Sequence, residues 1–180
     1  MTRIFLTLTI IGNTALLGAF WLGWQIEDSR SMAAAAQQQV TWHFFVALGA
    51  ALLALLVHAV ALTYFMGTGR WLEETSEAYD LGPEPRRENI RLKYRALPGM
   101  ILCILLLVAT VALGAAADPA SYIQFKSAVV IHFSLALATV VGNLLASWME
   151  HTAIASNGRL VEEVLTRVSQ IRRDRGLDPA

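Results

Sequence analysis

The chain has 180 residues, of which 56% are hydrophobic and only 16% are charged. A soluble domain carries about 25% charged residues, so this composition excludes an ordinary soluble globular protein. The 14 basic and 14 acidic side chains balance to a formal net charge of zero, and they form no basic-aromatic patch, so nucleic acid is not expected as a partner.

Four windows without Asp, Glu, Lys or Arg account for the missing charge. They cover residues 4–26, 31–69, 96–117 and 127–149. A helix needs about 20 apolar residues to cross a bilayer, so each window is long enough. We therefore predict an all-α membrane protein in which residues 1–150 form a four-transmembrane-helix bundle, with lipid as a partner. The expected spans lie near residues 4–24, 40–66, 98–117 and 127–149.

The basic residues indicate an orientation. All but two of them, Arg30 and Lys126, fall in segments on one side of the predicted bundle. The positive-inside rule then places both termini and the connection 67–96 in the cytoplasm. We predict a protein that is integral to the cytoplasmic (inner) membrane.

Small and polar residues recur at steps of three, four and seven in each window, which places them on one helical face. Lipid offers no hydrophobic drive for helices to associate, so such faces are expected to turn inward. His58 and Asn143 both lie roughly 7 Å to the cytoplasmic side of the midpoint of their spans. We therefore predict a hydrogen bond between them, and Asn13 is a third candidate for interhelical polar contacts.

Histidine inside a membrane span is the strongest functional signal of the chain, because an ionisable side chain in hydrocarbon is costly. His43 and His132 lie roughly 15 Å and 9 Å to the outer side of the midplane. Imidazole is a common axial ligand of haem iron, so this pair is the candidate site for a b-type haem. A second haem on His58 and His151 is not expected, because the spacing offsets that pair by about 6 Å. Without a cofactor, His43 is an interfacial residue beside Trp42.

Other chemistry is weaker. No zinc spacing, di-iron Glu-x-x-His motif or nucleophile elbow occurs, so neither a metal site of protein ligands nor an enzyme is predicted. The stretch Gly67-Thr68-Gly69-Arg70 lacks the spacing of a phosphate loop and is expected to end the second helix.

The connection 67–96 has an acidic first half and a basic second half, separated by Gly82-Pro83-Glu84-Pro85. Two interpretations stay open: two short helical pieces that pack acid against base, or a solvated loop. Pro98 is expected in the first turn of the third span.

The tail, residues 151–180, is predicted to be a cytoplasmic amphipathic helix that Asn157-Gly158 separates from the fourth span. Apolar residues at three-four-three spacing form a stripe on it, which must be buried against another surface. We expect a protein partner to cover this stripe, with anionic lipid as the alternative. The stripe consists of Val161, Val164, Val168 and Ile171.

Three functions follow from these features. The first is a non-catalytic integral membrane subunit or self-associating component of a larger membrane assembly, with copies of itself or other membrane subunits as partners. The alternative is a b-type haem electron-transfer membrane subunit. The third is a small ion or proton transporter or channel, which would need an intramembrane carboxylate near the midplane.

Overall fold

The computed structural model describes residues 1–29, 31, 33–118, 121–123 and 125–177. These residues form four helices joined by short connections, and each helix is long and apolar enough to cross a membrane. The predicted all-α class with four membrane-length helices is thereby confirmed. In chain order the helices are α1 (Thr2–Trp24), α2 (Ala34–Tyr79), α3 (Glu84–Ala117) and α4 (Ala128–Asp174).

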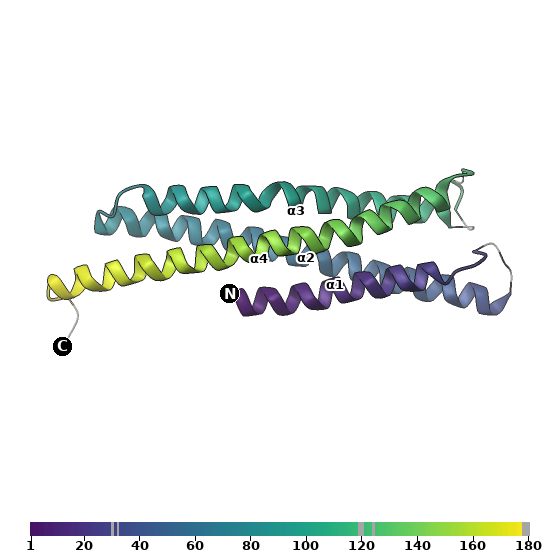
Figure 1. Cartoon of the computed structure of the whole chain (residues 1–180), viewed down its shortest axis with the longest axis horizontal. Coiled ribbons are helices and arrows are strands. Elements are labelled where there is room, and N and C mark those ends of the chain that lie inside the picture. The colour runs from purple at the N-terminus through teal and green to yellow at the C-terminus, as the bar shows by residue number, and fades with distance from the viewer. Residues whose placement is uncertain (30, 32, 119–120, 124, 178–180) are drawn as a thin grey trace.

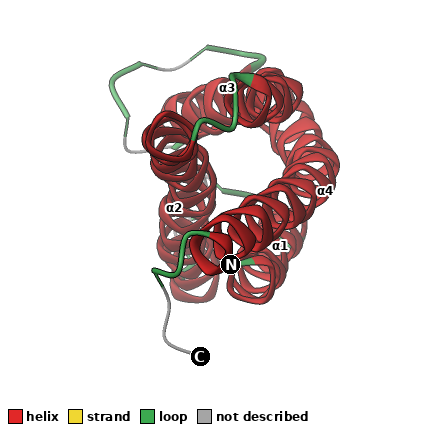
Figure 2. Ribbon diagram, turned by 90° about the vertical axis from the view of Figure 1, so that its left-hand side faces the viewer, coloured by secondary structure: helices red, strands yellow, loops and turns green. Residues whose placement is uncertain are grey.

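The helices pack as an up-and-down bundle (Figure 1). Both α1 and α3 contact α2 and α4, and α2 also meets α4 across the bundle. Figure 2 shows the helices grouped around one axis. The α1–α2 and α3–α4 connections lie together at one end, which we name the loop end. We name the opposite end, on the side where α1 begins, the N-terminal end.

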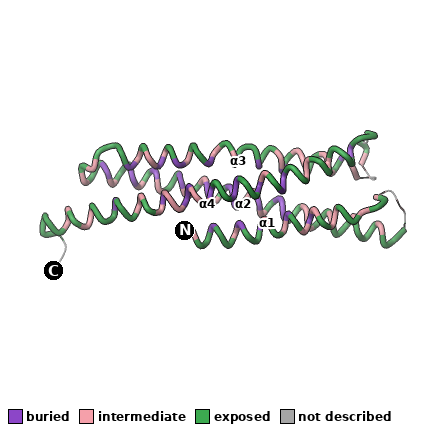
Figure 3. The backbone as a smooth tube through the Cα atoms, viewed as in Figure 1, coloured by how far each residue is buried: buried purple, intermediate pink, exposed green. Residues whose placement is uncertain are grey.

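Two apolar clusters fill the bundle. The cluster nearer the N-terminal end takes side chains from all four helices: Phe5, Val57, Ala61, Phe65, Leu92, Ala96, Met100, Ala153 and Ile154. The cluster nearer the loop end is built mainly of smaller side chains: Leu16, Ala19, Ala50, Ala51, Ala54, Leu107 and Val140. The inward orientation predicted for the small residues is confirmed for Ala50, Ala54 and Ala61 of α2, which are buried, while Leu52 and Leu145 are exposed. Figure 3 shows buried and exposed positions alternating along the helices.

The connection predicted for residues 67–96 is mostly helix. α2 continues to Tyr79 and α3 begins at Glu84, so the two expected pieces are continuations of the long helices. The chain reverses where Asp80 and Gly82 adopt positive φ angles of 55° and 79°. The prediction for Pro98 is wrong, because α3 starts earlier and Pro98 lies inside it.

The predicted helix break at Asn157-Gly158 is also wrong, since α4 runs through it without interruption. The side chain of Asn157 is fully buried and bonds across the bundle. Its Nδ2 donates to Thr68 Oγ1 at 2.9 Å, and its Oδ1 accepts from Asn89 Nδ2 at 2.8 Å. These tertiary contacts outweigh the local tendency of Asn-Gly to end a helix.

Beyond this polar layer only α2, α3 and α4 continue, as a three-helix extension made of residues 69–79, 84–89 and 157–174 (Figure 1). Within it, the acidic side of α2 meets the basic side of α3 where Arg86 Nε lies 3.3 Å from Glu73 Oε2. Arg172 Nη1 of α4 donates to the Tyr79 hydroxyl at 3.2 Å.

The apolar stripe of the tail lies on this part of α4. Val164 is 1% exposed, and the other members, Val161, Val168 and Ile171, are half-buried. The chain itself therefore covers much of the stripe that was expected to bind a partner.

Gly69 is required where α2 approaches α3. A Cβ there would lie 2.5 Å from both Arg86 Nη1 and Asn89 Oδ1, whereas nothing lies within 4 Å of a Cβ at Gly67. We expect Gly69→Ala to lower the free energy of unfolding by about 1–3 kcal/mol through overpacking. The neighbouring control Gly67→Ala should stabilise the helix by roughly 0.5–1 kcal/mol. Unfolding in detergent measures both, and equal effects would contradict the packing described.

Candidate functional site

His43, near the start of α2, packs closely against α1. Its Nδ1 lies 3.0 Å from the carbonyl oxygen of Ala19. The ring lies so near Gly23 that a Cβ added there would stand 2.7 Å from the imidazole Cε1. Glycine at position 23 thus allows the imidazole to lie against the α1 backbone.

His132, near the start of α4, repeats this arrangement on α3. Its Nδ1 lies 3.0 Å from the carbonyl oxygen of Thr110, and a Cβ at Gly114 would stand 3.0 Å from its Cε1. Thr110 and Gly114 are four residues apart, as are Ala19 and Gly23 on α1. The two helical hairpins therefore hold one histidine each in the same way.

The hydrogen bonds determine which ring nitrogen is free. A carbonyl oxygen only accepts, so the Nδ1 of His43 and that of His132 must each carry a proton. Each neutral ring then has its lone pair on Nε2, and among the described residues no hydrogen bond involves either Nε2 atom. The ring centroids are 6.2 Å apart, with the rings inclined at 76°. We name these two residues the histidine pair.

This separation suits a shared metal. A bond from a metal to an imidazole nitrogen is about 2.0–2.1 Å long, so two imidazoles on opposite sides of one metal have centroids roughly 6 Å apart. Alanine lies one turn along the helix from each ligand, at Ala47 on α2 and Ala136 on α4. The side chain that follows each histidine by one turn is therefore small.

The described residues contain no group of three or more His, Cys, Asp or Glu that could hold a metal ion. The histidine pair supplies two ligands. A metal bound there must therefore bring its remaining ligands with it.

A second polar site lies deeper in the bundle, and we name it the midbundle network: Asn13, His58, Asn143, Ser147 and Glu150. His58 Nε2 lies 3.0 Å from Asn143 Oδ1, and His58 Nδ1 lies 2.6 Å from Glu150 Oε1. His58 is 1% exposed and Glu150 is fully buried. Because both ring nitrogens have partners, His58 has no free nitrogen for a haem.

The network continues into α1. Asn143 Nδ2 donates to Asn13 Oδ1 at 2.9 Å, and Asn13 Nδ2 donates to the Thr9 carbonyl at 3.0 Å and to Ser147 Oγ at 3.2 Å. The structure thus brings together the three residues expected to make interhelical polar contacts. Asn13 lies near the middle of α1, so the network crosses the bundle at about half the length of that helix.

Glu150 was not predicted to belong to this network, because it directly follows the charge-free window 127–149. The available signal was the seven-residue spacing from Asn143, which puts both residues on one face of α4. Thr139 lies on the same face of α4, and its hydroxyl lies 2.7 Å from that of Thr110, beside His132.

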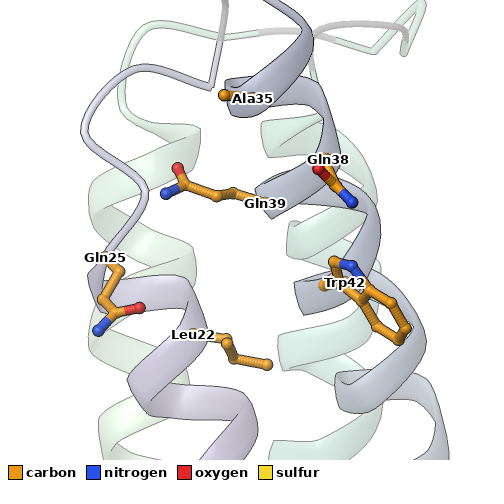
Figure 4. Close-up of a pocket in the computed structure, with 6 residues that line it drawn as sticks. All are labelled: Leu22, Gln25, Ala35, Gln38, Gln39 and Trp42. Carbon is orange, nitrogen blue, oxygen red and sulfur yellow. The ribbon is translucent and has the colours of Figure 1, made fainter.

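A hollow of about 340 Å³ lies between the ends of α1 and α2 and contains no charged side chain (Figure 4). Gln39, which lines it, is one turn before His43 on the same face of α2. The lining residues are Leu22, Gln25, Ala35, Gln38, Gln39 and Trp42.

The chain matches no family model, no curated protein and no solved structure.

The midbundle network should contribute measurably to stability. Hydrogen bonds between membrane helices average about 0.6 kcal/mol and reach about 1.7 kcal/mol. We expect a double-mutant cycle of Asn13→Ala and Asn143→Ala to give a coupling energy in this range, measured by unfolding in detergent.

A cycle of Asn13→Ala with Thr110→Val serves as the control, because these two residues share no partner. It should be additive within about 0.5 kcal/mol. Additivity in both cycles would show that the Asn13–Asn143 contact does not form.

Proposed function

We propose that this protein is a b-type haem membrane protein that transfers electrons, with His43 and His132 as the axial ligands of the haem. The observation that carries the proposal is the histidine pair. Its rings are 6.2 Å apart, and a backbone carbonyl fixes the Nδ1 of each ring. Such hydrogen bonds orient metal-ligating histidines and make them better ligands.

Haem fits better than a bare metal ion because its porphyrin supplies four nitrogen ligands. Only two more come from protein, which is the number that the histidine pair offers. The ligands come from α2 and α4, which contact each other across the bundle, and cofactors of helix bundles are bound between facing helices in this way.

Each structural feature has a role in this proposal. The carbonyls of Ala19 and Thr110 keep the lone pairs on Nε2, and Gly23 and Gly114 let the rings approach the neighbouring backbones. When bound, haem supplies one-electron redox chemistry. If both histidines hold the haem iron, no coordination site would remain for a substrate, which favours electron transfer over catalysis.

We also propose the orientation that the basic residues indicate. Arg86 and Arg172 belong to the three-helix extension, which then lies in the cytoplasm. The loop end faces the outside of the inner membrane, and the histidine pair lies in the outer half of the bilayer. The four helices are long and apolar enough to cross a membrane, which supports insertion into a bilayer, and the orientation rests on the basic residues alone.

We also propose that the protein belongs to a larger membrane assembly, because it needs partners for electron transfer. An electron carrier without a substrate site needs a donor and an acceptor, and these are other membrane components or further copies of the chain. The tail stripe lends this less support than expected, since Val164 is buried within the chain itself.

A visible spectrum of the protein, expressed with sufficient haem and purified, tests the main proposal. We expect a Soret band with the features of low-spin, bis-imidazole iron. The variants His43→Ala and His132→Ala should each lose the low-spin spectrum, because one axial ligand is then missing.

His151→Ala is the matched control, as this half-buried histidine lies on α4 outside the pair. It should bind haem as the wild type does. A wild-type protein without a Soret band, or a low-spin spectrum that survives both ligand substitutions, would overturn the proposal.

The close approach at Gly23 gives an independent prediction. A Cβ there meets the His43 ring, whereas nothing lies within 4 Å of a Cβ at Gly18 on the same helix. We expect Gly23→Ala to weaken haem binding about tenfold, equivalent to ~1.4 kcal/mol. Gly18→Ala should leave binding unchanged in a haem titration of the apoprotein. Equal affinities would contradict the assigned role of Gly23.

A further inference from the structure

The midbundle network has a fixed hydrogen-bond direction. It begins at the Thr9 carbonyl, which only accepts, so the Asn13 atom that faces it is the amide nitrogen. Asn13 Oδ1 must then accept from Asn143 Nδ2, which leaves Asn143 Oδ1 to face His58. His58 therefore donates from Nε2. The position of each hydrogen is thus fixed from the Thr9 carbonyl to His58 Nε2.

One proton remains to be placed. His58 Nδ1 and Glu150 Oε1 are 2.6 Å apart, a distance at which one hydrogen lies between them. The pair is then either imidazolium with carboxylate or imidazole with carboxylic acid. Both arrangements have zero net charge, and one further proton gives the pair a single positive charge.

The other side of the carboxyl group is not satisfied. Glu150 Oε2 is buried and has no hydrogen-bond partner in the described residues, and the same holds for Thr9 Oγ1. Asn13 Nδ2 bonds both the Thr9 carbonyl and Ser147 Oγ, which places the Thr9 turn of α1 beside the Ser147–Glu150 turn of α4. Buried polar atoms without a protein partner usually bind an internal water. Such a water at Oε2 can deliver a proton or remove one.

Among the side chains around the His58–Glu150 pair, Glu150 is the one that we expect to accept a proton. Thr9 and Asn13 of α1 do not titrate, and α2 contributes only His58. The group from α3 is Cys103, whose thiol lies beside the His58 ring. Asn143 blocks further transfer towards the loop end, because its amide holds one fixed hydrogen-bond direction. Towards the N-terminal end, Asn157 lies two turns of α4 beyond Glu150.

We propose that His58 and Glu150 form a proton-binding site in the middle of the membrane, in which the Glu150 carboxylate takes a proton from hydronium and releases it again. The step converts carboxylate and hydronium into carboxylic acid and water, so atoms and charge balance. Asn143 ends the path towards the loop end, so the site exchanges protons with the N-terminal side only. It requires no haem and goes beyond electron transfer.

Infrared difference spectroscopy of the full chain in lipid vesicles tests this, with the proton itself as the probe. On acidification we expect one carboxylic-acid carbonyl band per chain from a group shielded from water, shifting in D₂O. Glu150→Gln should abolish this band. Glu77→Gln is the matched control, because Glu77 is exposed on α2 and its loss should leave the band unchanged.

A second variant keeps the test decisive if Glu150→Gln does not fold. His58→Gln removes the proton partner, so the Glu150 carboxyl should remain protonated and its band should no longer respond to pH. If the wild type shows no such band at any pH at which it stays folded, the pair is a static ion pair and the proposal is wrong. A band that persists in Glu150→Gln would overturn it equally.

Discussion

Polar side chains buried in a helix bundle that crosses a membrane need hydrogen-bond partners inside the bundle, because hydrocarbon offers none. His58 and Glu150 meet this requirement at 2.6 Å, and Asn143 and Asn13 extend their contact to a backbone carbonyl of α1. The network thereby joins α1, α2 and α4 at one level, and the register of these helices depends on it. Apolar side chains alone would allow the helices to slide past each other at little cost.

The same need for a partner is met in the same way by both histidines of the histidine pair. Each helical hairpin presents a carbonyl and, four residues later, a glycine, and each places one imidazole against them. The two hairpins are therefore alike in local chemistry, although their sequences differ at most other positions. A ligand held between them meets equivalent surroundings on both faces.

The four helices and the pairing of the buried polar residues could be predicted from the sequence, because each depends on residues within one span. Charge-free windows reveal the helices, and residue depth identifies His43 with His132 and His58 with Asn143. Backbone carbonyl partners could not be predicted, since every residue carries a carbonyl. The continuity of α4 past Asn157 could not be predicted either, because it depends on Thr68 and Asn89 of other helices.

The uninterrupted α4 has a mechanical consequence. Its 47 residues span about 70 Å, more than twice the ~30 Å thickness of the hydrocarbon core. No hinge separates the part that carries His132 and Glu150 from the part in the three-helix extension. Because the helix is continuous, a small tilt near His132 would produce a larger displacement at its far end. A protein bound to the extension would be positioned to sense events at the buried sites.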